Sequence, residues 1–200
     1  MTEPAVPARA SSTDARGRII DAAYDLFSRR GIRAVGIDTI VAESGVAKMT
    51  LYRNFASKDE LVLEFLRVRE QRWTRDWLQA EVERRATAPD ERLLAIFDVF
   101  HDWFQLDAFE GCSFVNVLLE LTDLESPVRQ ASVEHLATIR SFVAELATEA
   151  GVADPDDFSR QWHILMKGSI VSAGEGDRDA ARRARRLGEL ALAQVVPSGR

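Results

Sequence analysis

Residues 36–58 read GIDTIVAESGVAKMTLYRNFASK and contain two short apolar-periodic segments on either side of a glycine. In the first segment Ile37, Ile40 and Val41 lie about one helical turn apart, which predicts a short helix with one apolar side. Gly45 can adopt a positive φ angle, so the junction predicts a tight turn. Two short helices across such a turn predict a helix-turn-helix. An ordinary αα-hairpin has the same spacing, so the outward face of the second helix has to separate the two interpretations.

The second helix predicted from this stretch has an apolar side and a polar side. Leu51 and Phe55 are four residues apart and therefore face inward. On the opposite side, arginine and asparagine are the types that read guanine and adenine by paired hydrogen bonds in the major groove. Lysine, threonine and tyrosine suit phosphates. We therefore predict a DNA-facing surface formed by Lys48, Met49, Thr50, Tyr52, Arg53 and Asn54.

The charge of the chain is unevenly distributed. The 200 residues carry a formal net charge of −6, which taken alone argues against DNA binding. Residues 9–58, however, hold nine basic and five acidic residues, whereas residues 59–200 hold 17 basic and 26 acidic ones. A small basic segment on an acidic body suits a reader of a polyanion whose body does not adhere to DNA.

Helical periodicity continues through the rest of the chain, and no long stretch alternates with the period of a strand. Apolar residues make up 46% of the chain, enough for a real core. No apolar run approaches the ~18–20 residues of a membrane span, and a single cysteine excludes an internal disulfide, so a cytoplasmic protein is the natural interpretation. The sequence predicts an all-α fold of about nine helices. Outside residues 36–58, the first predicted helix begins at Thr13-Asp14 and ends at Gly31, and a long helix covers about 58–85. A third helix begins with Asp90 as its cap. The remaining helices are predicted over 112–124, from 127 to Gly151, from 155 to Gly174 and over about 177–195.

One string in this region carries a family signature. LYRNFASKDEL, at residues 51–61, resembles the Leu-Tyr-x-x-Phe-x-x-Lys-x-x-Leu pattern of the TetR family of bacterial transcriptional regulators. The resemblance covers roughly residues 13–65. Two helix starts depart from the family's pattern, because Gly36 and Ala47 stand where Ser or Thr is usual. Alanine at such a position loses a helix cap worth about 1 kcal/mol.

The resemblance implies a homodimer of helical subunits, in which an N-terminal three-helix domain binds palindromic double-stranded DNA and the last two helices pair in an intersubunit bundle. It also implies that Tyr52 and Lys58 contact phosphates. The predicted function is a ligand-responsive repressor that a small apolar or amphipathic effector releases from its operator. The corresponding organisation is a disordered arm at 1–11, a DNA-binding domain at 12–57 with its helix-turn-helix at about 36–55, a helical effector-binding and dimerisation domain at 58–195, and a tail at 196–200.

The helical body offers candidates for an effector site, and each has a structural alternative. Aromatic residues at helical spacing line an apolar pocket or simply pack the core. Asn116 and Glu120 lie four apart on the 112–124 helix, which is otherwise apolar on nearly all sides and therefore predicted to be central and buried. Buried polar groups there are satisfied by each other, by the protein or by a ligand. His135 lies on an apolar face, with a hydrogen-bonded core histidine as the alternative. The candidate set is Trp77, Phe97, Phe100, Trp103, Phe104, Phe114, Asn116, Glu120 and His135.

A second hypothesis is a helical small-molecule-binding protein, or an enzyme, with a vestigial DNA-binding head. Its only support is the pair of weakened helix starts, and turnover of a metabolite without DNA binding would favour it. No nucleophile motif such as Gly-x-Ser-x-Gly occurs, and the three histidines are too scattered for a metal motif. We therefore predict no catalytic residues, no metal and no cofactor.

Overall fold

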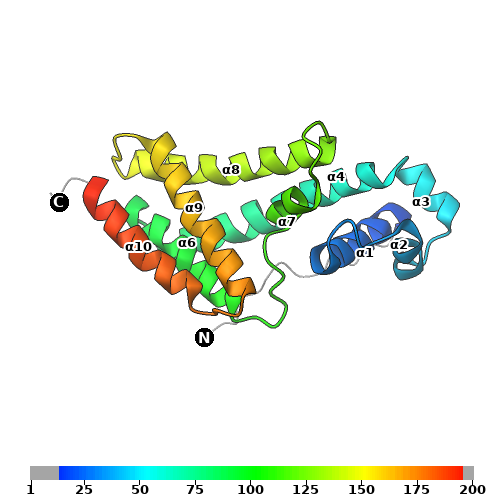
Figure 1. Ribbon diagram of the computed structural model, residues 1–200, viewed down its shortest axis with the longest axis horizontal. Helices are drawn as coiled ribbons and strands as arrows, with labels where there is room; N and C mark the ends of the chain where they lie inside the picture. Colours follow the sequence, from blue (N-terminus) through cyan, green and yellow to red (C-terminus); the bar gives the residue numbers. More distant parts are fainter. Residues whose placement is uncertain (1–13, 196–200) are drawn as a thin grey trace. The chain divides into compact units, whose positions relative to one another are not determined.

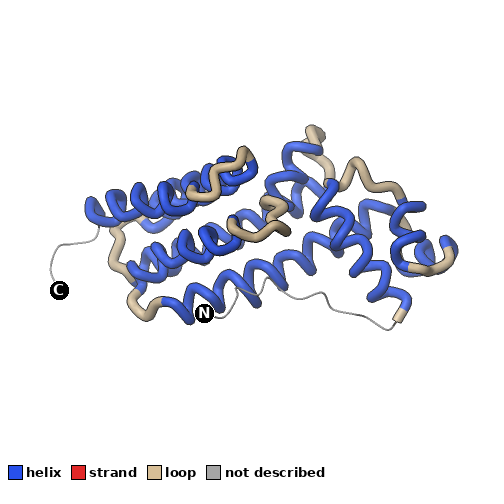
Figure 2. The backbone as a smooth tube through the Cα atoms, turned by 90° about the horizontal axis from the view of Figure 1, so that it is seen from below, coloured by secondary structure: helices blue, strands red, loops and turns tan. Residues whose placement is uncertain are grey.

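The computed structural model describes residues 14–195, and every regular element in that range is a helix. Figure 2 shows helices joined by loops, with no strand in this part of the chain. The predicted all-α fold is confirmed. The predicted arm at 1–11 and tail at 196–200 lie outside the described residues.

The helices follow the predicted order closely (Figure 1). α4, η1 and α5 run on without a break and form the long helix predicted over 58–85, with a π-helical middle. Counting this rod once, residues 14–195 contain nine helices. Their bounds are α1 Ala15–Arg30, α2 Ile37–Ser44, α3 Lys48–Asn54, α4 Lys58–Arg69, η1 Glu70–Gln79, α5 Ala80–Arg85, α6 Pro89–Phe104, α7 Ser113–Glu120, α8 Pro127–Glu149, α9 Pro155–Gly174 and α10 Ala180–Val195.

The described chain divides into two compact units. The head unit contains residues 14–73 and 112–136, and the body unit contains residues 74–111 and 137–195. The division therefore falls inside the long rod and inside α8, and it groups α7 with the helix-turn-helix. The boundary expected at 57/58 remains a prediction about functional domains.

Most helix ends lie where turn chemistry predicts them. The carboxylate of Asp14 accepts a hydrogen bond from Gly17 N at 2.6 Å and caps α1. Gly31 and Gly45 end α1 and α2 with positive φ angles of 77° and 65°. The expected cap of α6 was wrong: Ala88 is the N-cap, Pro89 follows as the first helical residue, and the predicted cap residue lies inside the first turn. Proline suits that position because its missing N–H has no partner in the helix.

The head core joins α1 to α4 through rings and one buried cation. Phe27 and Tyr24 of α1 pack edge-on against Phe65 of α4, at centroid distances of 5.4 and 5.7 Å. Arg69 is 4% exposed, and its guanidinium donates to Tyr24 Oη at 3.1 Å and to Ser28 Oγ at 3.3 Å. Burial of this cation is tolerated because its donors are hydrogen-bonded. α1 and α4 are thus held in a fixed relation to each other.

The body core is built from aromatic side chains. Trp103 lies at the centre of one cluster, with Phe109 at 4.8 Å and Phe104 at 5.6 Å between ring centroids. In another part of the body, α10 packs closely on α6 and α9. Gly188 makes this approach possible, because a Cβ there would lie 2.7 Å from Cη2 of Trp162.

The helix predicted over 112–124 is shorter and more exposed than expected. α7 ends at Glu120, and Leu121 continues in an extended conformation. Phe114 and Val117 are buried, but Leu119 is 76% exposed. Within a single subunit, the prediction of a central, buried helix was therefore wrong. A run of apolar residues does not determine how many sides of a short helix become buried.

Candidate nucleic-acid interface

α3 rests on an apolar base within the head unit. Leu51 and Phe55 are fully buried, and Val46 in the preceding turn is buried as well. Gly45 adopts the left-handed conformation expected of it, and its N–H donates to Val41 O at 3.1 Å. The local sequence folds in this way because a seven-residue helix has too few hydrogen bonds to be stable alone and depends on its buried face.

The opposite face of α3 is open to solvent, as predicted. Met49 is 68% exposed and Tyr52 is 44% exposed. Lys48 and Arg53 are also exposed, whereas Thr50 and Asn54 are partly exposed. The structure thus brings all six predicted residues onto one short helix, with their accessible atoms available to a partner.

Two of these six side chains have internal partners. Lys48 Nζ lies 2.7 Å from Asp38 Oδ1, and this hydrogen bond raises the pKa of the lysine. Both side chains are exposed, so water competes for the pair and a phosphate can replace the carboxylate. Asn54 Nδ2 donates to Thr50 O at 2.8 Å, which orients the amide along the helix. Sequence spacing indicated neither contact.

The two helix starts that depart from the family pattern lack side-chain caps. Neither Gly36 before α2 nor Ala47 before α3 makes a side-chain cap hydrogen bond. The first backbone N–H groups of these helices therefore have no side-chain acceptor there. This departure was predicted and is confirmed.

Lys58 lies at the start of α4, where local hydrogen bonds define the helix end. The hydroxyl of Ser57 accepts from Glu60 N at 3.1 Å, and the Glu60 carboxylate accepts from Ala56 N at 2.7 Å. This reciprocal arrangement resembles a capping box. It holds the partly exposed Lys58 in the first turn of α4, four residues after the end of α3.

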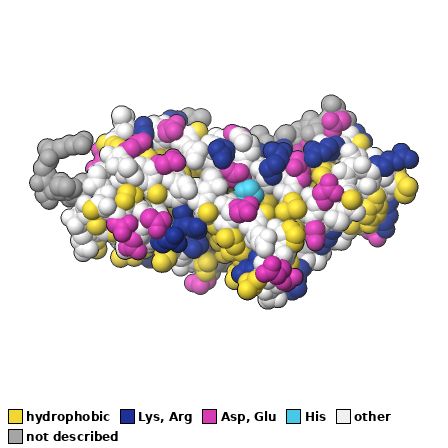
Figure 3. All heavy atoms as spheres, turned by 90° about the horizontal axis from the view of Figure 1, so that it is seen from above, with side chains coloured by type: hydrophobic (Ala, Val, Ile, Leu, Met, Phe, Trp, Pro, Cys, Tyr) yellow, Lys and Arg dark blue, Asp and Glu magenta, His cyan; other side chains and the backbone are white. Residues whose placement is uncertain are grey.

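The face in Figure 3 shows how charge is distributed at the surface. Lys and Arg side chains are interspersed with Asp and Glu over most of the view, and basic side chains lie at its right-hand end, where α2 and α3 appear in Figure 1. Such local positive charge is the electrostatic feature expected of a DNA-binding surface on an acidic protein.

The candidate effector residues are divided between the two units. Trp77, Phe97, Phe100, Trp103 and Phe104 belong to the body unit, where all five are buried. Phe114, Asn116, Glu120 and His135 belong to the head unit. Within the body unit, the close ring contacts among α6 residues are those of a packed core. Their role in effector binding remains a prediction.

Protein groups satisfy the Glu120 carboxylate. Its two oxygens accept the backbone N–H of Ile32 at 3.2 Å and of Arg33 at 2.7 Å. The side chain is partly exposed and belongs to the same unit as the turn that it contacts. Three alternatives were open for this acid: a bond with Asn116, bonds with other protein groups, or a ligand. In the structure, other protein groups satisfy it. Its partners lie 88 and 87 residues away in sequence, so no local pattern indicated them.

His135 has an aromatic neighbour and an acidic neighbour. Its ring lies 5.2 Å from the ring of Phe114, and its Nδ1 is 3.5 Å from Glu70 Oε2. Burial lowers the pKa of His135, and the nearby carboxylate of Glu70 opposes that shift only in part. The neutral form is therefore favoured at pH 7, and the contact with Glu70 is a long polar contact more than an ion pair.

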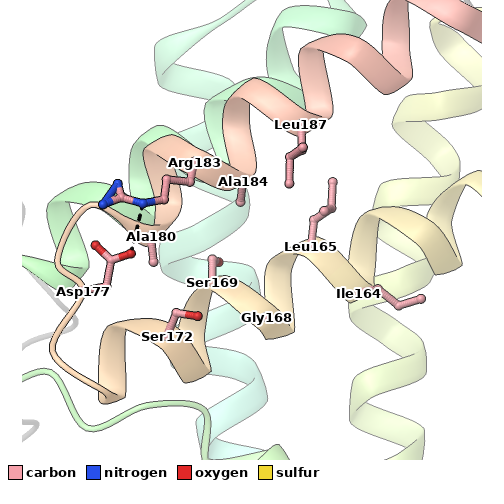
Figure 4. Close-up of a pocket in the computed structure, with 10 residues that line it drawn as sticks. All are labelled: Ile164, Leu165, Gly168, Ser169, Ser172, Asp177, Ala180, Arg183, Ala184 and Leu187. Carbon is pink, nitrogen blue, oxygen red and sulfur yellow. Dashed lines mark ion pairs between the residues drawn. The ribbon is translucent and has the colours of Figure 1, made fainter.

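α9 and α10 together expose an apolar groove of about 280 Å³ (Figure 4). Leu165 and Leu187 point toward each other from the two helices, and Ile164 points away from them. Small residues form its floor, and Arg183 pairs with Asp177 at 3.3 Å at one end. Its lining residues are Ile164, Leu165, Gly168, Ser169, Ser172, Asp177, Ala180, Arg183, Ala184 and Leu187.

Within residues 14–195, no group of three or more His, Cys, Asp or Glu side chains is arranged to hold a metal ion. In the same range no helix combines the length and apolar character needed to cross a membrane.

Two family models match the chain and together cover most of it. The model of bacterial regulatory proteins of the TetR family matches residues 19–65, and the model of a tetracycline repressor-like C-terminal domain matches residues 89–187. The first match contains α2 and α3 with the exposed residues that were predicted to face DNA. The chain belongs to the TetR family, a class of DNA-binding transcriptional regulators and not of enzymes.

Individual relatives agree with this assignment. The chain is 35% identical over 95 residues to the HTH-type transcriptional activator FasR of Mycolicibacterium smegmatis, covering 46% of this chain and 42% of that protein. It is 35% identical over 85 residues to the HTH-type transcriptional repressor KstR2 of Mycobacterium tuberculosis, covering 41% and 40%. The match thus spans about two fifths of the length of these curated relatives.

Solved structures resemble the chain over nearly its full length. A TetR-family transcriptional regulator from Streptomyces coelicolor superposes with a TM-score of 0.81 at 29% identity, covering 92% of this chain and 96% of that one. The reduced form of NemR from Escherichia coli gives a TM-score of 0.82 at 16% identity, covering 93% and 100%. The second likeness shows the fold alone.

Proposed function

We propose that this protein is a homodimeric transcriptional regulator that binds a palindromic operator through α3 and represses until an effector releases it. The observation that carries the proposal is the face of α3: five polar side chains suited to DNA, together with Met49, are exposed or partly exposed on a helix whose inward residue Leu51 is fully buried. A helix supported in this way enters the major groove as a rigid unit.

The chemistry of the α3 face divides into two roles. Arg53 is exposed and suits a bidentate contact with guanine. Tyr52 and Lys58 suit phosphates, which fix the register of the protein on DNA without reading sequence. Lys48 joins them once it exchanges Asp38 for a phosphate oxygen.

The α9–α10 face supports the homodimer. Ile164 and Leu190 are each 64% exposed, and Val171 and Leu187 are more than half exposed. Apolar side chains at this density on two adjacent helices are typical of a surface that another subunit covers. Two such faces brought together bury these side chains and place two α3 helices on one assembly, as a palindrome requires.

Repression and its release by an effector form the regulatory part of the proposed function. Two of the similar curated proteins are named as an activator and a repressor, so the names alone leave the sign of regulation open. An apolar or amphipathic effector remains the expectation from the aromatic residues of the body. Native mass spectrometry of the purified protein, with crystallography of any loaded sample, tests for a bound small molecule directly.

The primary test is a gel shift with the DNA upstream of the protein's own gene. We expect a specific complex that weakens steeply with salt, because phosphate contacts release counterions. Arg53→Ala should lose discrimination between operator variants by roughly 1–3 kcal/mol. Lys58→Ala should instead weaken all sequences alike and reduce the salt slope by about one unit. No salt-sensitive specific complex with pure protein would count against DNA binding, and unchanged discrimination in Arg53→Ala would remove its base-reading role.

The dimer has its own test. Leu187→Glu places a charge on the α9–α10 face and should shift sedimentation from dimer toward monomer. Leu124→Glu is the matched control, since this leucine is also exposed but lies in the head unit. A wild-type protein that sediments as a monomer at micromolar concentration would exclude the proposed dimer.

A further inference from the structure

The turn between α1 and α2 is closed by a side chain from far along the sequence. Glu120, the last residue of α7, accepts two consecutive backbone N–H groups, those of Ile32 and Arg33. A carboxylate that accepts two N–H groups makes charge-assisted hydrogen bonds, which are shorter and stronger than neutral ones. The shorter of the two, 2.7 Å from Arg33 N, has this character.

The backbone of the turn is shaped to admit the carboxylate. A Cβ on Gly31 would lie 2.4 Å from Glu120 Oε1 and 3.0 Å from its Cδ, so only glycine leaves room. Gly31 also has φ 77° and ψ 164°, a region essentially restricted to glycine. The side chains of Ile32, within the turn, and Val35, just after it, are buried, which holds the turn on the core while its N–H groups face Glu120.

The backbone of α7, which carries Glu120, is held from α8. Arg129 donates to the carbonyl oxygens of Leu118 at 3.3 Å and Leu121 at 3.5 Å, at the carboxyl end of α7. Ser132 Oγ donates to Phe114 O at 3.2 Å near the start of the same helix. All of these residues belong to the head unit. A continuous set of hydrogen bonds thus runs from α8 through α7 to the turn that leads into α2.

We propose that Glu120 is a positioning residue for DNA binding: through the turn at Gly31–Arg33 it fixes the helix-turn-helix on α7. This inference rests on the proposed DNA-binding function. α2 starts seven residues after Arg30, and α2 and α3 pack together and on α1. Freeing the turn therefore adds motion to the groups that must meet phosphates and bases together, and each complex must then remove that motion at a cost in affinity.

The sign of the effect separates this role from simple electrostatics. Removing an acid from a DNA-binding unit lowers its repulsion for phosphates, and by itself that change strengthens binding. A positioning role has the opposite sign. We expect Glu120→Ala to weaken binding to the shifted DNA fragment on the order of tenfold, since two hydrogen bonds to a charged acceptor are lost.

Two other variants complete the experiment. Glu120→Gln keeps the shape and one acceptor oxygen but places an NH₂ group against the second backbone N–H, so we expect an intermediate loss of about threefold. Glu125→Ala removes the same charge from an exposed residue of the following loop and should leave affinity equal or slightly higher. The salt slope should stay at the wild-type value in all three, because none of these residues contacts a phosphate.

A second readout does not involve DNA. In ¹H–¹⁵N spectra and hydrogen exchange of the full-length protein, the amides of Ile32 and Arg33 should shift and exchange faster in Glu120→Ala, with circular dichroism unchanged. If Glu120→Ala binds DNA as tightly as Glu125→Ala, the positioning role is overturned while the proposed function stands. If the wild type forms no complex, the proposed function fails and the positioning role with it, although the two amides still report whether the contact exists.

Discussion

The turn after α1 and the turn after α2 look alike in sequence and differ in structure. Each helix ends at a glycine with positive φ, 77° at Gly31 and 65° at Gly45. Gly45 has a ψ of 21°, an ordinary left-handed conformation, and a Cβ there would meet nothing within 4 Å. Gly31 has a ψ of 164°, and a Cβ there would strike the carboxylate of Glu120. One glycine only turns the chain, whereas the other also makes room for a tertiary contact.

The largest expected effect comes from adding a side chain to the occupied turn. Gly31→Asn should lower the free energy of unfolding by about 3 kcal/mol, from strain in a glycine-only region together with displacement of the Glu120 carboxylate. Urea unfolding at fixed protein concentration measures the change. Fixed concentration is needed because the stability of a dimer depends on it.

Gly45→Asn is the matched variant in the open turn. Asparagine tolerates the left-handed conformation, so we expect a loss below about 1 kcal/mol. Equal losses at the two glycines would mean that the contact with Glu120 adds nothing, and the comparison between the turns would not hold.

A buried histidine whose Nδ1 lacks a hydrogen-bond partner in the described part of the chain contrasts with Glu120, which has two. Glu120 has two donors, whereas Nδ1 of His163, in the body unit, has no hydrogen-bond partner among the described residues. Burial, assisted by the cations of Lys167 and Arg140, lowers the pKa of His163 to about 3. The unfolded chain takes up this proton near pH 6.5 and the folded chain does not, so stability falls as pH drops from 6.5 toward 3.

We expect this histidine to account for about 2 kcal/mol of lost stability between pH 7 and pH 5. Urea unfolding of the wild type and of His163→Leu at both pH values isolates the contribution, because leucine does not titrate. The same pH dependence in both proteins would show that His163 is protonated in the folded state or is accessible to water.

The smallest expected effect is at Gly188, where aromatic rings occupy the space that a Cβ would need. At Gly188 a Cβ would lie 2.7 Å from Cη2 of Trp162 and 3.3 Å from Cε2 of Phe97. Gly188→Ala should cost about 1 kcal/mol, because overpacking against buried rings outweighs the gain in helix propensity. Gly174→Ala, where a Cβ would meet nothing within 4 Å, is the control and should be close to neutral. A stabilised Gly188→Ala would mean that the rings move aside easily.

The exposed face of α3 was predictable because it depends on short-range geometry. Lys48 to Asn54 occupy a single helix, and their exposure follows from the buried positions of Leu51 and Phe55 four residues apart. The ends of α1, α8 and α9 were predictable for the same reason, since glycine and proline act on their own neighbours. The exposure of Leu119 and the partners of Glu120 were not, because both depend on which helices meet α7.

By itself the sequence determined an all-helical chain, the order and approximate limits of its helices, its family, and the face of α3 that is open to solvent. These follow from residue periodicity, turn chemistry and a local signature, and each acts over a few residues. Only the tertiary structure decided that Glu120 closes the turn at Gly31, that Gly188 lies against Trp162 and that His163 is buried without a partner for Nδ1. Those contacts join residues far apart in the chain, and folding alone brings them within hydrogen-bonding or packing distance.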